Sequence, residues 1–492
     1  MDELHQRRRI LMERTAWLAV GVVVFSGIWG GLFIRGLNPG FDWKLFVEGC
    51  RYFWEHRGFG GQGWMFGYTP GGFFFLMPFT VWLTSPWGLL LHVAGNAAAA
   101  IGSVWVVHRW WTGGRLGGGI VWPVLLVAIN IQQVLQMNQL SLWVLVLCAG
   151  GLALAGRGWP FWGGALIGLA VAIKVMPLVL LGYFGCRGQW RALLGVAAGV
   201  IALDVVPSVL FLGYDGAAVE HRAWRERSGW YSPTAQIYEP LRLGIYHHRS
   251  NFSYPSVLVR WLRGLPEVEE MVVLRGDPPA EAVEAARAGL RGNQALVVDP
   301  LPLDGKPWAR QVLPISRSVP RWSAARWPAE RVWWVWAASV GLGMGLLAVW
   351  TWWTGRIGQG RDWPAASAAW MLSMFWLTPL MMNYYLVLAF PAMAVVWLEL
   401  VRSRRKTPGR WLAIVGLAAW VVGEACIGWR DVRWYGVHWV VLAVLGAAVV
   451  WAWARQLGLS VVSEAGSLPA AAERVVERDS DRRRQAGCVG RV

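Results

Sequence analysis

The residue best placed to do chemistry near the start of this sequence is an acidic one. Asp42 stands in "GFDWK", a few residues after the first long apolar segment. A carboxylate there, flanked by Phe41 and Trp43, could act as a general base on a hydroxyl group. It could equally be a solvated loop residue, or cap a helix that begins at Trp43.

A lysine inside an apolar run is the second candidate. Lys174 lies near the middle of 161–184. A lysine at the bilayer centre costs roughly 2.5–3.5 kcal/mol, and at about 1.5 Å per residue the ends of one continuous helix would be about 15 Å away. The ammonium therefore needs a wet cavity or a partner inside the protein. A lipid phosphate is one partner. Asp204 is the other, because antiparallel helices joined by the basic turn 187–191 would bring both charges to similar depth.

A polar cluster later in the chain could bind an anion. The stretch "YHHRSNFSYPS" (246–256) carries His248, Arg249 and Asn251 just before an apolar segment. These donors suit an anionic head group. An ordinary loop at the membrane surface would explain the same residues.

Two further polar breaks interrupt apolar runs. In "WLTPLMMNYYLVLAFP" a proline break is followed by Asn383 and Tyr384. Irregular backbone at membrane depth is tolerated only where protein or water covers it, so this stretch predicts either a cavity wall or a plain turn. The other break is Asn138–Gln139, which we expect on the cytoplasmic side, away from the other candidates.

The elements that must position these residues are apolar helices. Of the 492 residues, 56% are hydrophobic, and the apolar runs are long enough to cross a bilayer. They predict an all-α polytopic membrane protein, a bundle of about 10–12 transmembrane helices with a small soluble α/β insert. The expected spans are 16–34, 71–84, 86–107, 119–135, 140–156, 161–184, 192–213, 331–353, 364–378, 380–400, 410–427 and 437–455.

The positive charge of the chain fits a membrane protein better than a nucleic-acid-binding protein. The formal net charge is +17, but the arginines cluster beside apolar segments. This arrangement is typical of cytoplasmic anchors under the positive-inside rule. With the N-terminus in the cytoplasm, the basic turns 186–191, 354–361 and 402–406 face the same side. The turn 108–115 falls outside, against the rule.

The chain divides into four expected regions. Residues 1–265 form an N-terminal transmembrane core with the first outer loop, and 330–456 form the C-terminal transmembrane helices. Between them, 266–329 is a soluble insert in an outer loop, where a strand, a helix and a strand are expected. Residues 457–492 are polar and predicted to be a disordered cytoplasmic tail.

Five stretches in this order resemble glycosyltransferase family 87, membrane enzymes of the GT-C fold that include polyprenol-phosphate-mannose-dependent mannosyltransferases. They are "GFDWKLFVEG", "FGYTPGGFFFLMPF", "MNQLSLWVLVL", "GGALIGLAVAIKVMPLVLL" and "SNFSYPSVLVRWL". The likeness covers roughly residues 15–400. In "LTPLMMNYYL", Met382 and Tyr384 stand where the family has tryptophan and histidine, and this departure puts the substrate in doubt.

The resemblance implies a hexosyltransferase that uses a polyprenyl-phosphate sugar donor and a glycan or glycolipid acceptor. Transfer would be inverting and would need neither a metal nor a cofactor. It would take place at the outer face of a bacterial plasma membrane, and its product would belong to the cell envelope. Asp42 would be the general base. Positive charge, not an acid, would stabilise the leaving phosphate. The phosphate ligands would be Lys174, Arg249, Asn251 and His248, and the sugar-pocket residues Tyr68, Asn383 and Tyr384.

Two other classes of protein share some of these features. A transporter or flippase for a lipid-linked solute would also have charge at mid-membrane and broken helices. It predicts two repeated halves, which the sequence does not show. A structural membrane subunit is the third class. Membrane lipids are expected partners in every case, and nucleic acid in none.

Overall fold

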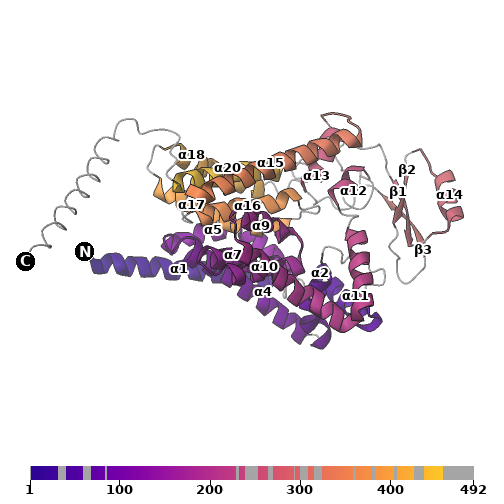
Figure 1. Ribbon diagram of the computed structural model, residues 1–492, viewed down its shortest axis with the longest axis horizontal. Coiled ribbons are helices and arrows are strands. Elements are labelled where there is room, and N and C mark those ends of the chain that lie inside the picture. The colour runs from indigo at the N-terminus through magenta and orange to yellow at the C-terminus, as the bar shows by residue number, and fades with distance from the viewer. Residues whose placement is uncertain are drawn as a thin grey trace, which may run out of the picture.

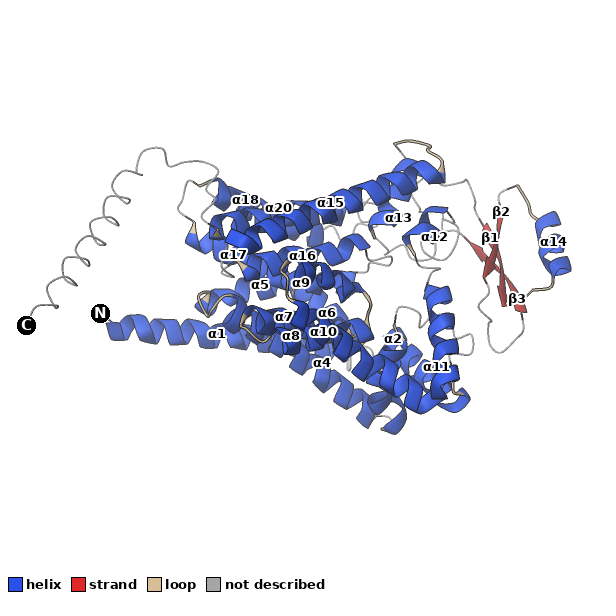
Figure 2. Ribbon diagram, in the orientation of Figure 1, coloured by secondary structure: helices blue, strands red, loops and turns tan. Residues whose placement is uncertain are grey.

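The computed structural model is an elongated bundle of helices with a small sheet at one end (Figures 1 and 2). It describes residues 2–30, 40–58, 68–83, 86–228, 232–238, 253–263, 270–276, 278–292, 294–299, 308–314, 324–357, 362–377, 383–403, 407–425 and 437–457. The expected tail 457–492 therefore lies, beyond its first residue, outside the described part of the chain.

In its described residues, the first half of the chain consists of helices and the short turns between them; the labels η mark 3₁₀ or π turns. Its elements are α1 (Asp2–Trp29), α2 (Gly40–His56), α3 (Pro70–Met77), η3 (Pro78–Trp82), α4 (Trp87–Val106), η4 (Val107–Trp111), η5 (Gly117–Ile120), α5 (Val121–Leu126), α6 (Ala128–Met137), α7 (Ser141–Gly156), α8 (Pro160–Ile173), η6 (Met176–Val179), α9 (Leu180–Cys186), α10 (Trp190–Val200), η7 (Ile201–Val205) and α11 (Val206–Ser228).

The second half adds the sheet and the remaining helices. Its elements are α12 (Pro233–Tyr238), α13 (Tyr254–Leu258), η9 (Val259–Arg263), β1 (Glu270–Gly276), α14 (Ala280–Ala288), β2 (Gln294–Asp299), β3 (Trp308–Pro314), α15 (Ala329–Ile357), α16 (Trp363–Leu377), η10 (Asn383–Ala389), α17 (Phe390–Arg402), α18 (Pro408–Ala425) and α20 (Val437–Gln456).

Long apolar helices confirm the prediction of a polytopic membrane protein. Six stretches of the described chain are long and apolar enough to cross a membrane, or seven if the bent pair 117–126 and 128–137 counts as one span. The shorter apolar helices α7, α8 and η6–α9 lie between them. Helices enclosed by other helices contact protein instead of lipid, so they can be shorter than a bilayer is thick.

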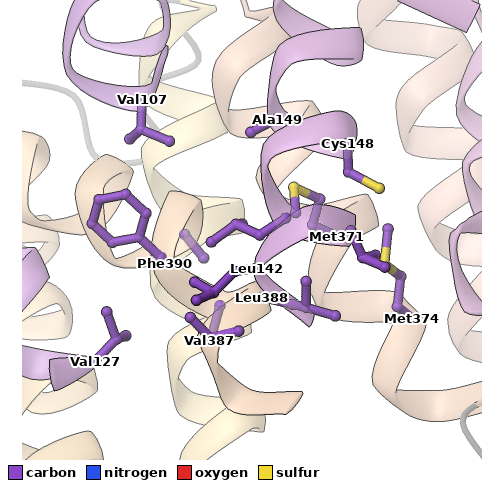
Figure 3. Packing of buried hydrophobic residues seen from close by; sticks show 14 of the residues in the cluster. Val107, Val127, Leu142, Cys148, Ala149, Met371, Met374, Val387, Leu388 and Phe390 are labelled. Atoms are coloured by element: carbon purple, nitrogen blue, oxygen red, sulfur yellow. The ribbon is translucent and has the colours of Figure 1, made fainter. Parts of the chain in front are cut away.

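The core joins helices from both halves of the sequence. Around Leu142 of α7, Figure 3 shows Val107 of η4, Met371 of α16 and Phe390 of α17. All four side chains are at most 1% exposed. The region before the insert and the region after it therefore share one apolar core.

The described residues of the basic turns lie at the end of the bundle where α1 begins and α20 ends. Arg187 binds Asp362, which also binds Trp453 near the end of α20, and Arg115 lies close enough to Arg402 for their charges to interact. In Figure 1 this is the end that carries the N-terminus. His108 of η4 lies 3.3 Å from Glu13 of α1, so the turn 108–115 belongs to this end. The prediction that it lies on the opposite side was wrong.

Since α4 ends at this basic end of the bundle, it starts at the far end, where α1 finishes. Thr69, at the start of α3, bonds to Ala172 near the end of α8, and Phe79 of η3 lies against Gly88 at the start of α4. Both ends of 71–84 therefore lie at the far end, and this segment is not a crossing span.

A second difference concerns 161–184, which is not one helix. The backbone at Gly164 lies against Ala192, and that at Gly168 against Val196 and Gly199. This register means that α8 and α10 run in the same direction, so α9 must return between them. Pro177, within η6, cannot continue the hydrogen-bond ladder of a helix through this break. Lys174 thus marks a turn between two passes.

The insert contains the expected strand, helix and strand, followed by a strand that was not predicted. The sheet order is β2-β1-β3, with β1 parallel to β2 and antiparallel to β3. One face, with Val272 and Leu274, packs against Ala286 of α14. The other face, with Met271 and Val273, joins an apolar cluster of α12, η9 and α15. The sheet is therefore anchored to the end of the bundle opposite the basic turns.

A buried ion pair ties three helices together at the basic end. The Asp362 side chain is 0% exposed. It accepts hydrogen bonds from Arg187 Nη1 at 3.1 Å and from Trp453 Nε1 at 2.6 Å. Asp362 stands at the start of α16. Through its bonds to Arg187 and Trp453 it connects the turn after α9 with the end of α20.

Removing the charge of Asp362 should destabilise the protein. In Asp362→Asn the buried Arg187 guanidinium loses its counter-ion, which costs about 3–5 kcal/mol for buried pairs. We expect a clearly lower midpoint of thermal unfolding in detergent. Asp215→Asn is the control, because Asp215 is exposed on α11. Equal midpoints for the two variants would contradict the role assigned to the ion pair.

Candidate functional site

Lys174 lies at the break between α8 and η6, enclosed by polar and aromatic groups. It is 3% exposed. Its Nζ donates to Gln139 Oε1 at 3.3 Å and to Tyr385 OH at 3.4 Å. The same nitrogen lies 4.9 Å from the ring centroid of Tyr68 and 4.4 Å from that of Tyr385, which are cation–π distances. We call Lys174, Gln139, Tyr68 and Tyr385 the lysine cluster.

Gln139 reaches Lys174 because of the way α6 ends. Asn138 adopts a left-handed conformation (φ 55°), which asparagine tolerates better than most residues. The Gln139 amide donates to Val134 O at 3.0 Å and the Asn138 amide to Leu135 O at 3.4 Å. This pair of bonds is the Schellman pattern of a helix C-terminus. The turn presents the Gln139 side chain to both Lys174 and Tyr68, whose OH donates to Oε1 at 2.5 Å.

Tyr68 is held by the turn that starts α3. Thr69 caps this helix: its Oγ1 accepts from the Gly72 amide at 3.3 Å and donates to Ala172 O of α8. The Gly71 amide donates to Asp204 Oδ1 at 2.5 Å. Contacts from α8 and η7 therefore fix the backbone beside Tyr68, and with it the phenol next to Lys174.

Asp204 does not serve as the counter-ion of Lys174. Besides the Gly71 amide, its carboxylate faces His221 Nδ1 at 3.9 Å, and the ion pairs between described side chains include no contact between Asp204 and Lys174. The antiparallel arrangement behind that alternative was wrong. Because α8 and α10 are parallel, Asp204 and Ala172 come to the same end of the two helices. There both lie against Gly71 at the start of α3.

The helix that carries Asp42 packs directly on the lysine cluster. Asp42 lies in the first turn of α2, and its side chain is outside the described residues. One residue on, Trp43 is 4% exposed. One turn on, the Phe46 ring meets the Tyr68 ring edge-on at 5.2 Å between centroids. The sequence places Asp42 in this helix, and the fold brings the helix to Lys174.

The remaining predicted site residues are only partly described. His248, Arg249 and Asn251 lie outside the described residues. The backbones of Asn383 and Tyr384 open η10, a 3₁₀ turn, but their side chains are also outside the described set.

Two members of the lysine cluster were not among the predicted site residues. Gln139 was recognised as a polar break but assigned to the cytoplasmic side, away from the site. That assignment was wrong, because counting 71–84 as a crossing span reversed the direction of the next segments. Tyr385 directly follows Tyr384. The proline break therefore pointed to the correct stretch of sequence, but Asn383 and Tyr384 were selected from it and Tyr385 was left out.

The chemistry of the cluster favours an anion. A buried ammonium beside two phenols and one amide offers positive charge and hydrogen-bond donors in an apolar surrounding, where charge interactions are strong. Among the described residues, no group of three or more His, Cys, Asp or Glu side chains is close enough together to hold a metal ion.

Comparison with known families decides the class of this protein. The profile of glycosyltransferase family 87 matches residues 66–285. Through this stretch the chain is similar to glycosyltransferase family 87, which supports the family suggested by the sequence. No curated protein and no solved structure gives a significant match.

The family 87 match confirms the resemblance seen in the sequence and identifies the protein as a membrane glycosyltransferase. The matched residues contain Tyr68, Gln139 and Lys174, whereas Asp42 precedes them and Tyr385 follows them. The lysine cluster therefore joins the matched region of this glycosyltransferase to a helix from the C-terminal part of the chain.

Gln139→Leu should impair the enzyme, because Leu cannot accept the hydrogen bonds from Lys174 and Tyr68. We expect kcat/KM to fall about tenfold, which corresponds to about 1.4 kcal/mol. Gln132→Leu is a matched control on α6, the helix that ends just before Gln139, since Gln132 binds Ser26 of α1 instead. Steady-state kinetics of both variants test this, and equal losses would contradict a specific role for Gln139.

Proposed function

We propose that this glycosyltransferase moves a hexose, with mannose the first candidate, from a polyprenyl-phosphate donor to an acceptor hydroxyl at the outer face of the membrane. The observation that carries the proposal is the buried Lys174 with its two tyrosines and Gln139, next to the helix of Asp42. The acceptor would be a glycan or glycolipid of the cell envelope.

The lysine cluster would receive the phosphate of the donor. A buried ammonium is costly in an apolar bundle, and a bound phosphate would offset that cost. As the bond between the anomeric carbon and the phosphate oxygen breaks, the electron pair leaves with the polyprenyl phosphate. The ammonium of Lys174 then stabilises the developing negative charge, so no acid has to protonate the leaving group. His248, Arg249 and Asn251 remain candidates for further phosphate contacts.

Asp42 would act on the acceptor. Its carboxylate takes the proton from the acceptor hydroxyl while that oxygen attacks the anomeric carbon. A single displacement of this kind inverts the anomeric configuration. Neither a metal nor a cofactor takes part. Tyr68, Asn383 and Tyr384 would line the sugar pocket between the two reacting groups.

The charge distribution supports an outward-facing site. The basic turns share the end of the bundle where α1 begins, and basic turns favour the cytoplasm. Lys174 lies at the end of α8, and Gln139 lies in the turn between α6 and α7. Both positions are at the end of the bundle away from the basic turns, toward the sheet. A donor entering from the bilayer could reach the cluster without a soluble nucleotide-sugar domain.

A transfer assay tests the proposal. Purified protein would be incubated with polyprenyl-phosphate mannose and an extract of envelope glycolipids as acceptor. We expect free polyprenyl phosphate to appear in step with a mannosylated product. In liposomes, movement of intact donor across the membrane without its cleavage would favour a flippase instead, and cleavage of a donor with a different hexose would change the sugar but keep the reaction.

A further inference from the structure

A buried histidine outside the lysine cluster touches both sides of the proposed site. His92 of α4 is 0% exposed. Its Nε2 lies 3.0 Å from the backbone oxygen of Asn138. Its ring lies 4.8 Å from the ring of Trp43, between centroids, at 34° between the planes. One imidazole thus contacts the turn that presents Gln139 and the helix that carries Asp42.

The contact with Asn138 fixes the protonation of the ring. A carbonyl oxygen only accepts, so Nε2 must carry the hydrogen and donate it. Asn96 lies one turn further along α4, with an amide atom 3.1 Å from the same nitrogen. Because Nε2 carries the hydrogen, the amide atom that faces it must be the oxygen, which accepts. Nδ1 is buried and has no hydrogen-bond partner among the described residues. The donor function of His92 is therefore directed at the α6–α7 turn.

The carbonyl that accepts this bond is critical for the placement of Gln139. Asn138 is the left-handed residue at the end of α6, where backbone carbonyls lose their partners within the helix. Gln139 follows directly and meets Lys174 at 3.3 Å. A small rotation of the Asn138 peptide would move the Gln139 amide away from both Lys174 and Tyr68.

The second contact of His92 is that of its ring with Trp43, the neighbour of the proposed base Asp42. Trp43 follows Asp42 and packs on the imidazole, while the Phe79 ring of η3 meets the imidazole at 5.4 Å. The ring is thus wedged between α2, η3 and the α6–α7 turn. Its size sets how closely the first turn of α2 approaches the lysine cluster.

We propose that His92 is a positioning residue: its Nε2–H holds the Asn138–Gln139 turn, and its ring holds the first turn of α2, so that the phosphate-binding cluster and the proposed base keep a fixed separation. The inference rests on the proposed transfer reaction. Misplacement of reacting groups by about 1 Å can cost about 100-fold in rate, so the effect should appear in kcat.

Two substitutions separate the two contacts. His92→Phe keeps a ring against Trp43 but loses the donor to Asn138. His92→Gln keeps a donor but loses the ring. We expect kcat of H92F to fall about 10- to 100-fold with the donor KM within about threefold. H92Q still holds the turn but loses the ring against Trp43, so its kcat should also fall, by about tenfold, and wild-type turnover of H92Q would exclude the role assigned to the ring.

Hydrogen–deuterium exchange gives a readout that does not depend on activity. In H92F the amides of Asn138 and Gln139, which close the end of α6, should exchange faster, while those within α7 stay unchanged. In H92Q protection of both amides should persist. His108→Phe is the matched control: His108 is a buried histidine of η4 at the opposite end of the bundle, and it should change neither readout at the site.

The outcomes distinguish this inference from the proposed function. Normal transfer and normal exchange in H92F would overturn the positioning role and leave the function standing. Equal losses of amide protection in H92F and H92Q would also overturn it, because the donor to Asn138 would then not be what holds the turn. If H92F does not fold, faster exchange of Asn138 and Gln139 in H92Q decides against it. If the wild-type protein shows no transfer, the function fails and exchange alone tests the contact.

Discussion

Replacing Asp42 with asparagine is expected to abolish sugar transfer and to leave the folded protein intact. Asparagine has almost the same shape as aspartate but cannot take a proton from the acceptor hydroxyl. General-base catalysis contributes about 10²- to 10⁴-fold to a reaction, so kcat should fall by at least about 100-fold. The measurement is release of polyprenyl phosphate by purified Asp42→Asn protein, with its unfolding midpoint recorded in parallel.

A second carboxylate on the same helix provides the control for Asp42. Glu48 is exposed on α2, and Glu48→Gln removes one negative charge from the same helix. We expect this variant to keep wild-type turnover. Full activity of Asp42→Asn, or loss of activity only in Glu48→Gln, would exclude Asp42 as the base.

Lys174→Met should nearly eliminate transfer without destabilising the protein. Methionine fills a similar volume but leaves the phosphate of the donor without a positive partner in a low-dielectric site. Loss of such an electrostatic contact costs about 10²- to 10³-fold in kcat. In this variant Tyr68 still donates to Gln139 and methionine fills the space of the lysine side chain, so the unfolding midpoint should stay close to that of the wild type.

This combination of outcomes separates a functional lysine from a structural one. If Lys174 served only to hold Gln139 and Tyr385 together, its removal would lower stability and activity in parallel. Lys44→Met is the matched control, since Lys44 is exposed on α2. Wild-type turnover of Lys174→Met would refute the proposed role of the lysine cluster in binding the leaving group.

The contacts of the lysine cluster show which of the residues chosen from the sequence lie together and which residues the sequence pattern placed elsewhere. Tyr68 and Lys174 were chosen from sequence, and both lie in the lysine cluster. Gln139 was seen as a polar break but assigned to the wrong end of the bundle. The error came from 71–84, which is apolar enough to suggest a span but returns to the end where it started.

Apolar length is an unreliable guide to crossings inside a bundle. In 161–184 a single run of spanning length contains two passes, α8 and α9, with Lys174 at the turn between them. Helices surrounded by protein need not match the thickness of the bilayer, so a long run can hold a hairpin. Lys174 therefore lies at a turn between helices, where its charge meets polar groups from other parts of the chain.

By itself the sequence determined the membrane class, the existence and type of most elements, and the positions where polar residues interrupt apolar runs. It did so because these depend on local composition: apolar runs, basic clusters, proline breaks and the ordered motifs of family 87. Only the tertiary structure decided which polar groups meet. Lys174, Gln139, Tyr68 and Tyr385 come from four separate segments, and His92 from a fifth. Their proximity depends on whether neighbouring helices run parallel or antiparallel, a property of packing between distant segments that no local pattern encodes.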